Sequence, residues 1–307
     1  MSSSTDSMDP LVIVNPTAGN GAGRRSWPRV AEAARDRGIS WEVAFTTHPG
    51  HATELAAEAV AAGRPLVAVL GGDGSVNEVV NGLVEPGVPG AERPELAILP
   101  VGTGRDTIRT YGIPKRPVPA LELLLSGATR TIDIGTATFA SHRRLFINIG
   151  SCGLTGAVAD RANSTSKRLG GTPSFLYATI ATFARWQNVP FHVRVDDQQL
   201  DLVANNVICA NGRAFGGGIL VCPQAEPDDG LLDVLIWGDV GKLDLARELP
   251  RLYRGKHLGH PRLTVLRGRE IEVVPERPLA IELDGELPGS TPVTFGIAPG
   301  ALRLRVP

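Results

Sequence analysis

The segment GGDGS at residues 71–75 is the part of this sequence whose residue types most clearly suggest chemistry. It sets Asp73 between glycines, directly after the apolar run LVAVL, and Asn77 and Glu78 follow soon after. A carboxylate among backbone N–H donors makes little sense as structure alone. It makes sense if a divalent cation joins Asp73 to phosphate oxygens, because Mg²⁺ favours a few carboxylates together with substrate oxygens.

Two further glycine-containing segments follow apolar runs in the same way. Asn15 begins NPTAGNGAG after the run LVIV, and VGTGR at residues 101–105 follows LAILP. Glycines at such places let the backbone approach phosphate closely and adopt positive φ. The Walker pattern is absent, and G-x-G-x-x-G fails in the first segment because Arg24 stands where the last glycine belongs. For any one of these loops alone, a tight strand-to-helix turn is the competing interpretation.

The first 135 residues alternate β-branched runs with helix-like stretches, which predicts parallel strands joined by crossover helices. In an open parallel sheet, ligands sit beyond the carboxyl ends of the strands, and the glycine loops occupy that place. A polyphosphate is the expected occupant. Strands are expected at residues 11–15, 41–46, 66–70 and 96–100, and helices at 27–38, 52–62 and 76–84.

After Thr131 the pattern changes to short segments, several of which alternate with period two. The segment FHVRVDDQQLDLVA at residues 191–204 predicts a hairpin, and the remainder predicts a mostly antiparallel β-sandwich or open barrel. Helices are expected around residues 174–187 and 242–253. The fold class is therefore an α/β N-terminal domain with a parallel Rossmann-like sheet, followed by a mostly antiparallel C-terminal β-sandwich.

Composition restricts the classes of function. The formal charge is −1 at pH 7, so no global field favours nucleic acid or an acidic membrane surface. No apolar run approaches the roughly 20 residues of a spanning helix, and residues 1–9 lack the features of a secretory signal. The three cysteines form no C-x-x-C pair, which fits a reducing compartment. We expect a cytoplasmic protein, with peripheral contact to a membrane left open.

The sequence contains no recognisable set of zinc ligands and no hydrolase nucleophile motif. His48 and His51 are three apart, as are His257 and His260, but each pair lacks a third candidate ligand nearby, so zinc is not expected. No nucleophile elbow of the G-x-S-x-G type occurs.

GGDGSVNEV resembles the G-G-D-G-T-x-N-E signature of the diacylglycerol-kinase catalytic-domain family, which includes bacterial lipid kinases and sphingosine kinases and is related to NAD kinases. Four further blocks agree in order and spacing: NPTAGNGAG, PVGTGRD, PDDGLLDV and LDGE. The similarity extends from about Leu11 to Val306. It implies an ATP- and Mg²⁺-dependent kinase that phosphorylates a hydroxyl of diacylglycerol or a related lipid, met at the membrane surface or delivered by a carrier.

The resemblance also implies roles for single residues. Glu286 would be the general base, with Asp284 beside it; without the resemblance, Asp284-Gly285-Glu286 predicts a hairpin turn. The nucleotide would be contacted by Asn15, Thr46, Gly71, Gly72, Asp73, Gly74, Ser75, Val76, Asn77 and Thr103.

The block PDDGLLDV implies a second site. In the family this stretch binds a structural magnesium through an aspartate and neighbouring backbone carbonyls, and the matching residues are Glu226, Asp229 and Leu231. Asp228-Asp229-Gly230 also fits an ordinary turn.

The domains implied are an α/β nucleotide-binding domain and a β-sandwich substrate domain. The first would cover residues 9–134 and be completed by 298–307, the second would cover 135–297, and residues 1–8 would form a disordered tail. A homodimer is left open.

Two departures from the family pattern bear on substrate choice. Ser75 replaces a threonine but keeps the hydroxyl. Arg105 replaces the usual asparagine, and its guanidinium could pair with a phosphate or with Asp106. An NAD-kinase-like enzyme acting on a soluble hydroxyl, and a nucleotide-binding regulator without catalysis, stay open as alternatives.

A lipid acceptor calls for an apolar groove with a basic rim. Lys167-Arg168 and the apolar residues of 175–186 offer both at helical spacing. Such a stripe is more often simply core, so both interpretations stand.

Overall fold

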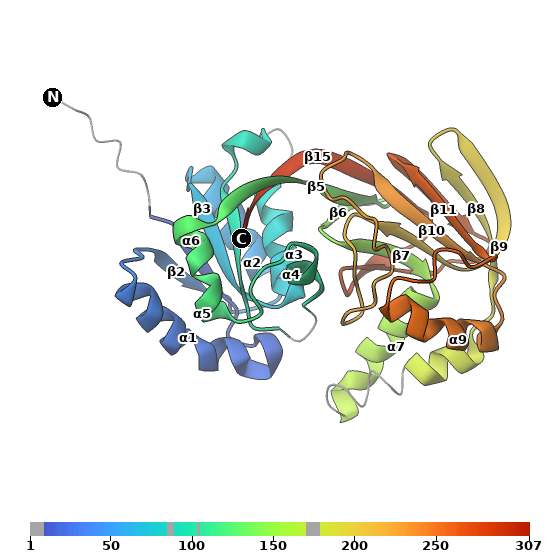
Figure 1. The fold of residues 1–307 in the computed structure, drawn as a ribbon, viewed down its shortest axis with the longest axis horizontal. Coiled ribbons are helices and arrows are strands. Elements are labelled where there is room, and N and C mark those ends of the chain that lie inside the picture. Colours follow the sequence, from blue (N-terminus) through green and yellow to red (C-terminus); the bar gives the residue numbers. More distant parts are fainter. Residues whose placement is uncertain (1–8, 85–88, 103–104, 170–178) are drawn as a thin grey trace. The chain divides into compact units, whose positions relative to one another are not determined.

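The computed structural model of the chain divides into two compact units (Figure 1). One unit contains Met1–Asp133 with Gly300–Pro307, and the other contains Ile134–Pro299. The chain passes between them twice, within β5 (Ala128–Thr138) and within β15 (Val293–Val306). The residues described are 9–84, 89–102, 105–169 and 179–307.

The first unit is built on a parallel sheet. Its strands lie in the order β15, β4, β3, β1, β2. Val14 pairs with Leu70, and Leu70 pairs with Leu99, so β1, β3 and β4 end at the same level. The strands are short apolar runs, and β1 and β3 are buried along their whole length, as expected where helices cover both faces. The bounds are β1 Leu11–Val14, β2 Glu42–Phe45, β3 Leu66–Gly71 and β4 Glu95–Pro100.

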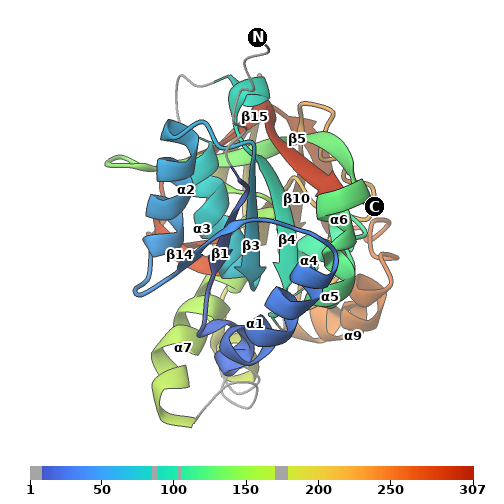
Figure 2. The ribbon, with the colours of Figure 1, turned by 90° about the vertical axis from the view of Figure 1, so that its left-hand side faces the viewer.

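Helices cover the two faces of this parallel sheet (Figure 2). Val12 and Val14 of β1 share an apolar cluster with Val30 and Ala34 of α1 and with residues of α5, so α1 and α5 pack on one face. On the other face α2 and α3 pack together and against β1 and β3. The bounds are α1 Ala18–Asp36, α2 His51–Ala61, α3 Asp73–Leu83, η1 Gly90–Glu92, α4 Asp106–Thr110, α5 Pro117–Ala120 and α6 Glu122–Ser126.

The second unit is an antiparallel, sandwich-like domain in which the long strand β9 joins two groups of strands. The first half of β9 pairs with β8, and its second half pairs with β7 and β10. Apolar side chains from the strands form one core cluster that includes Phe146 and Phe295. The strands are β6 Arg143–Phe146, β7 Ile149–Gly153, β8 Val189–Val195, β9 Gln198–Ala210, β10 Leu232–Gly238, β11 Leu263–Gly268, β12 Glu270–Pro275, β13 Ala280–Leu283 and β14 Glu286–Ser290.

Most predicted elements are confirmed, including the hairpin at 191–204 and the helix α9 (Lys242–Tyr253). Several differ. Helix α1 begins at Ala18 rather than at residue 27, with positive φ and non-helical backbone at residues 19–21, and α3 begins at Asp73 rather than at residue 76. The helices α4 to α7 (α7 is Leu154–Leu169) and the strands β5 to β7 were not predicted. The helix expected at 174–187 is present at 179–185, while its first five residues lie outside the described part of the chain. Among the described residues, no helix is both long and apolar enough to span a bilayer.

Candidate active site

Three glycine-containing loops meet at the carboxyl end of the parallel sheet. A Cβ added to Gly102, after β4, would lie 2.6 Å from the Cα of Gly72, after β3. A Cβ added to Gly19, after β1, would lie 2.3 Å from the backbone oxygen of Val101. Approaches this short are open only to glycine, so the loops pack backbone against backbone. They therefore present mainly backbone groups at this edge of the sheet.

Helix α3 begins at this meeting point. Its N-cap is Gly72, whose backbone oxygen accepts the N–H of Val76 at 3.0 Å, and none of the described side chains caps the helix. The N–H groups of Asp73, Gly74 and Ser75 in the first turn have no acceptor within the helix. Such an N-terminus binds anionic oxygens, because the backbone donors and the helix dipole act together.

Asn15 joins the first loop to α3. Its Nδ2 donates to the Oγ of Ser75 at 2.8 Å, and its Oδ1 accepts the backbone N–H groups of Thr17 and Ala18 at 3.0 and 3.2 Å. Ser75 is buried, and a Cβ on Gly71 would lie 2.4 Å from its Cβ. Asn15 and Ser75 were expected as nucleotide contacts, and in the structure their side chains hold the loops in place.

Asp73 occupies the first position of α3. Its Oδ1 accepts the backbone N–H of Thr107 at 3.4 Å, which brings the start of α4 to the same place. Its Oδ2 accepts no backbone N–H among the described residues, so Asp73 could hold a divalent cation through this oxygen. Thr103, also expected as a nucleotide contact, lies outside the described residues.

The other expected nucleotide contacts differ in exposure. Thr46 is half-buried just after β2, whereas Val76 and Asn77 are buried within α3. The neighbouring Glu78 accepts the backbone N–H of Ala52 at 3.2 Å through Oε2 and so caps α2. The second half of the GGDGSVNE block therefore joins two helices, while its first half forms the loop.

In the second unit, LDGE forms the turn between β13 and β14. Asp284 and Gly285 have φ values of 48° and 94°, as a two-residue hairpin turn requires, and Leu283 pairs with Glu286. The Asp284 carboxylate accepts the backbone N–H groups of residues 147–149 at 2.7 to 3.1 Å, with both oxygens used. Asp284 thus ties the hairpin to the chain before β7.

Two glutamates flank this turn in contrasting environments. Glu282 is 6% exposed; its Oε1 accepts the backbone N–H of Gly285 at 2.6 Å and its Oε2 accepts the hydroxyl of Ser151 at 2.7 Å. Glu286 is exposed at the start of β14. Glu282 therefore anchors the turn, and Glu286 presents its carboxylate to solvent, where a proton acceptor could act.

The PDDGLLDV block forms the turn before β10, and a guanidinium lies among its acids. Asp229 Oδ1 accepts the backbone N–H of Leu231 at 3.0 Å, and Asp229 Oδ2 pairs with Arg267. The Nε of Arg267 lies 3.5 Å from Asp233 Oδ1, and Glu226 is exposed. Both oxygens of the aspartate expected to hold magnesium are engaged, so Glu226, Asp229 and Leu231 as arranged do not fit a divalent ion.

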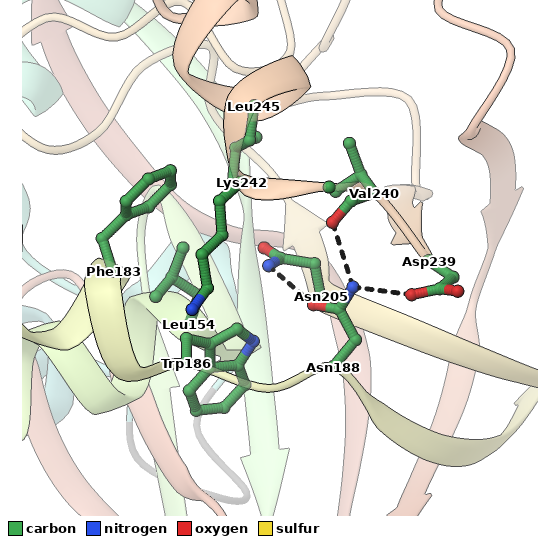
Figure 3. A pocket seen from close by; sticks show the side chains of 10 residues that line it. Leu154, Phe183, Trp186, Asn188, Asn205, Asp239, Val240, Lys242 and Leu245 are labelled. Carbon is green, nitrogen blue, oxygen red and sulfur yellow. Dashed lines mark hydrogen bonds between the residues drawn. The ribbon is translucent and has the colours of Figure 1, made fainter.

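A cavity of about 190 Å³ lies in the second unit (Figure 3). Lys242 extends toward Trp186 between Phe183 and Asn205, and a polar side is formed by Asn188, which donates to Asp239 at 2.9 Å. Phe183 and Trp186 belong to the stripe that was considered for a lipid groove. The side chains of Lys167, Arg168 and residues 175–177 lie outside the described part of the chain.

The histidines and cysteines form neither a metal site nor a nucleophile in the part of the chain that the structure describes. Glu54 joins His48 and His51 in a cluster, so the expectation that no third ligand lies nearby was wrong. However, His51 Nδ1 accepts the backbone N–H of Thr47 at 3.1 Å, which leaves the proton of the neutral ring on Nε2 and no lone pair for a metal. Burial raises the pKa of Cys152 to about 12, so its thiol is no nucleophile near neutral pH.

The two halves of the chain each match a known family. The family described as "Diacylglycerol kinase catalytic domain" matches residues 9–137, and "YegS C-terminal NAD kinase beta sandwich-like domain" matches residues 148–306. A protein of Pseudomonas aeruginosa strain UCBPP-PA14, named "Probable lipid kinase YegS-like", is 32% identical over 300 residues, which cover 98% of this chain and 96% of the relative. The chain belongs to the diacylglycerol kinase family.

Other members of the diacylglycerol kinase family agree over the same length. A protein of Mycobacterium tuberculosis strain CDC 1551 / Oshkosh, named "Diacylglycerol kinase", is 29% identical over 300 residues, 96% of this chain and 94% of its own. A crystal structure from Bacillus anthracis strain Sterne, named as a candidate diacylglycerol kinase, superposes with a TM-score of 0.79 at 26% identity and covers 97% of both chains. Membership makes this chain a phosphotransferase with an alcohol group as acceptor.

Arg105 is the clearest departure from the diacylglycerol kinase pattern in the segment that follows β4. It is exposed at the N-cap of α4 with φ 62°, in the left-handed region. Asparagine, the usual family residue here, enters this region more readily than arginine. The backbone conformation at this position therefore favours asparagine over arginine.

Proposed function

We propose that the chain is an ATP- and Mg²⁺-dependent lipid kinase, which transfers the γ-phosphate of ATP to a hydroxyl of diacylglycerol or a related lipid. The observation that carries this proposal is the meeting of three glycine loops at the uncapped N-terminus of α3. Converging backbone donors of this kind suit a polyphosphate. The names of the relatives from Mycobacterium tuberculosis and Pseudomonas aeruginosa support a lipid as the acceptor.

In this proposal the first unit is the nucleotide-binding domain. The first-turn N–H groups of α3 bind phosphate oxygens, and Asp73 is the residue that would hold a cation there. Mg²⁺, when bound, neutralises charge on the phosphates of the nucleotide. Phosphoryl transfer asks the protein mainly for positioning and charge neutralisation, which fits loops that present backbone rather than side chains.

The second unit is the substrate domain and supplies the proton acceptor. The hydroxyl oxygen of the lipid forms a bond to the γ-phosphorus as the bond from that phosphorus to the bridging oxygen breaks, and ADP leaves. The proton of the hydroxyl passes to the carboxylate of Glu286. Exposure of Glu286 on a two-residue turn held by Glu282 and Asp284 supports this role.

The proposal is tested by supplying the purified chain with γ-labelled ATP and Mg²⁺ and with one acceptor at a time. Diacylglycerol in mixed micelles, a sphingoid base and NAD are the three acceptors. We expect label in an organic-extractable product that depends on diacylglycerol or a related lipid. Label in NADP would instead favour the NAD-kinase-like alternative, and intact ATP binding without any product would favour the regulator.

A further inference from the structure

The turn that precedes β10 gathers acidic groups around one side chain. Asp229 and Glu226 lie in the turn, and Asp233 follows in β10, where it is only 2% exposed. An acidic group buried to this degree requires a counter-charge or a proton.

The register of the sheet places Arg267 where its positive charge can neutralise Asp233. In the antiparallel pair of β10 and β11, Arg267 lies directly opposite Asp233. From there its Nε is 3.5 Å from Asp233, and its terminal nitrogen reaches Asp229 in the turn. The contact therefore follows from strand pairing, so the guanidinium is held at the turn by the β-sheet.

A second arginine serves the same turn. The Nε of Arg213 donates to the backbone oxygen of Ala225 at 2.9 Å. Backbone carbonyls and an aspartate are the groups that the family resemblance assigns to a structural magnesium. Here the Asp229 carboxylate is already bound by the guanidinium of Arg267, and the carbonyl of Ala225, which lies just before the segment, is bound by that of Arg213.

We propose that Arg267 is the built-in counter-cation of residues 226–233, and that this turn is ordered without a bound divalent ion. The side chain fastens the turn to β11 and neutralises Asp229 and Asp233 at once. Since the sheet supplies the cation, the order of the turn does not depend on the concentration of magnesium. This role is separate from the Mg²⁺ that the kinase reaction uses with its nucleotide.

Thermal unfolding of the whole chain without nucleotide tests the proposal. The melting temperature is measured in EDTA and in about 10 mM MgCl₂ at matched ionic strength. We expect the wild type to show the same melting temperature in both solutions. Arg267→Met should lower it by about 2–4 °C, as expected for the loss of roughly 1 kcal/mol in a chain of this size, and added Mg²⁺ should restore part of that loss.

A control variant tests whether the effect is specific to Arg267 or follows from the loss of any exposed arginine. Arg269→Met changes an exposed arginine in the turn after β11 and should leave the melting temperature unchanged. Wild-type stabilisation by Mg²⁺ that disappears in Asp229→Asn would overturn the proposal, because the ion would then occupy the turn. An Arg267→Met protein as stable as the wild type would overturn it as well. The wild-type measurement decides the question even where a variant fails to fold.

Discussion

At the LDGE turn, three carboxylates within five residues have different surroundings. Asp284 accepts backbone N–H groups with both oxygens, Glu282 is buried under hydrogen bonds, and Glu286 is exposed. Glu286→Gln should reduce kcat by about 10²–10⁴, the usual contribution of a general base, while the affinity for ATP stays nearly the same. Turnover measured beside ATP binding checks this, with the exposed Glu276→Gln as the control. Near-normal turnover would remove Glu286 as the base.

Arg105 should be replaceable with a gain in stability. Its φ of 62° costs an arginine about 1 kcal/mol or more, and asparagine adopts this conformation more readily. We expect Arg105→Asn to raise the melting temperature by about 1–3 °C. The same substitution at Arg109, which lies inside α4, should lower it because asparagine is a poor helix former. Equal changes at the two positions would show that the backbone conformation at 105 is not strained.

Among single residues, the sequence predicted the residues expected to take part in the reaction more readily than the residues that hold them in place. Asp73 stands in a glycine-rich block, and Glu286 stands in the LDGE block that the family resemblance singles out, whereas no motif marks Glu282 in AIEL. Alternation along the strand places it opposite the buried Ile281 and Leu283, on a face expected to meet solvent. The structure buries it because α7 packs on β13, so closely that a Cβ on Gly156 would lie 2.1 Å from the backbone oxygen of Ala280.

The elements at the proposed phosphate site are held by backbone contact between loops. Gly102→Ala would push the loop after β4 away from Gly72, because the new Cβ would lie 2.6 Å from its Cα. We expect the KM for ATP to rise by about tenfold or more, since small displacements of binding groups cost this much. Gly259→Ala meets nothing within 4 Å and serves as the control. An unchanged KM in Gly102→Ala would contradict the phosphate site assigned to these loops.

The hairpin that carries Glu286 should depend on Glu282. Glu282→Ala removes the acceptor of the exposed Gly285 N–H and one partner of the buried Ser151 hydroxyl, and an unsatisfied buried group costs about 1–3 kcal/mol. We expect a lower melting temperature and a fall in kcat with little change in the KM for ATP. Glu282→Gln keeps an acceptor oxygen and should recover most of both losses. Wild-type kcat in a folded Glu282→Ala protein would show that Glu282 does not position the turn.

Elements were predictable where their periodicity is strong. The β-branched and apolar runs predicted β1, β3 and β4. The alternation of charged and apolar residues along residues 242–253 predicted α9. Helix α7 was missed because LTGAVADRANSTSKRL has few large apolar residues and many residues that form helices poorly. The start of α3 was placed too late because Gly74 in its first turn resembles a loop residue, although Asp73 there is favoured by the helix dipole.

At the scale of the whole molecule, the order of the sequence patterns along the chain predicted an α/β unit followed by a β-sandwich unit. It did not predict the side-chain contacts that stabilise each unit. The switch from crossover helices to short alternating segments near residue 131 lies close to the division between the units at Asp133 and Ile134. The role of Arg267 was not predictable, because it depends on the pairing of β10 with β11 across more than thirty residues of sequence. Long-range register is the information that a single sequence lacks.

Buried His257 should make the stability of the molecule depend on pH. The ring is fully buried, donates from Nε2 to the backbone oxygen of Val221 at 2.8 Å and stacks on Trp237. Burial lowers its pKa below 6.5, so the unfolded chain takes up a proton first as the pH falls. The folded state is therefore favoured above about pH 6.5 and loses up to about 1.4 kcal/mol per pH unit below it, until the folded pKa is passed.

Urea unfolding between pH 7.5 and 5.5 measures this effect. His257→Gln keeps a donor for Val221 but cannot take up a proton, so its unfolding free energy should fall less over this interval than that of the wild type. His192→Gln, which changes a half-buried histidine paired with Asp201, should keep most of the wild-type slope. If His257→Gln retained the full slope instead, the acid sensitivity would have to come from other groups, and His257 would be a packing residue with no part in it.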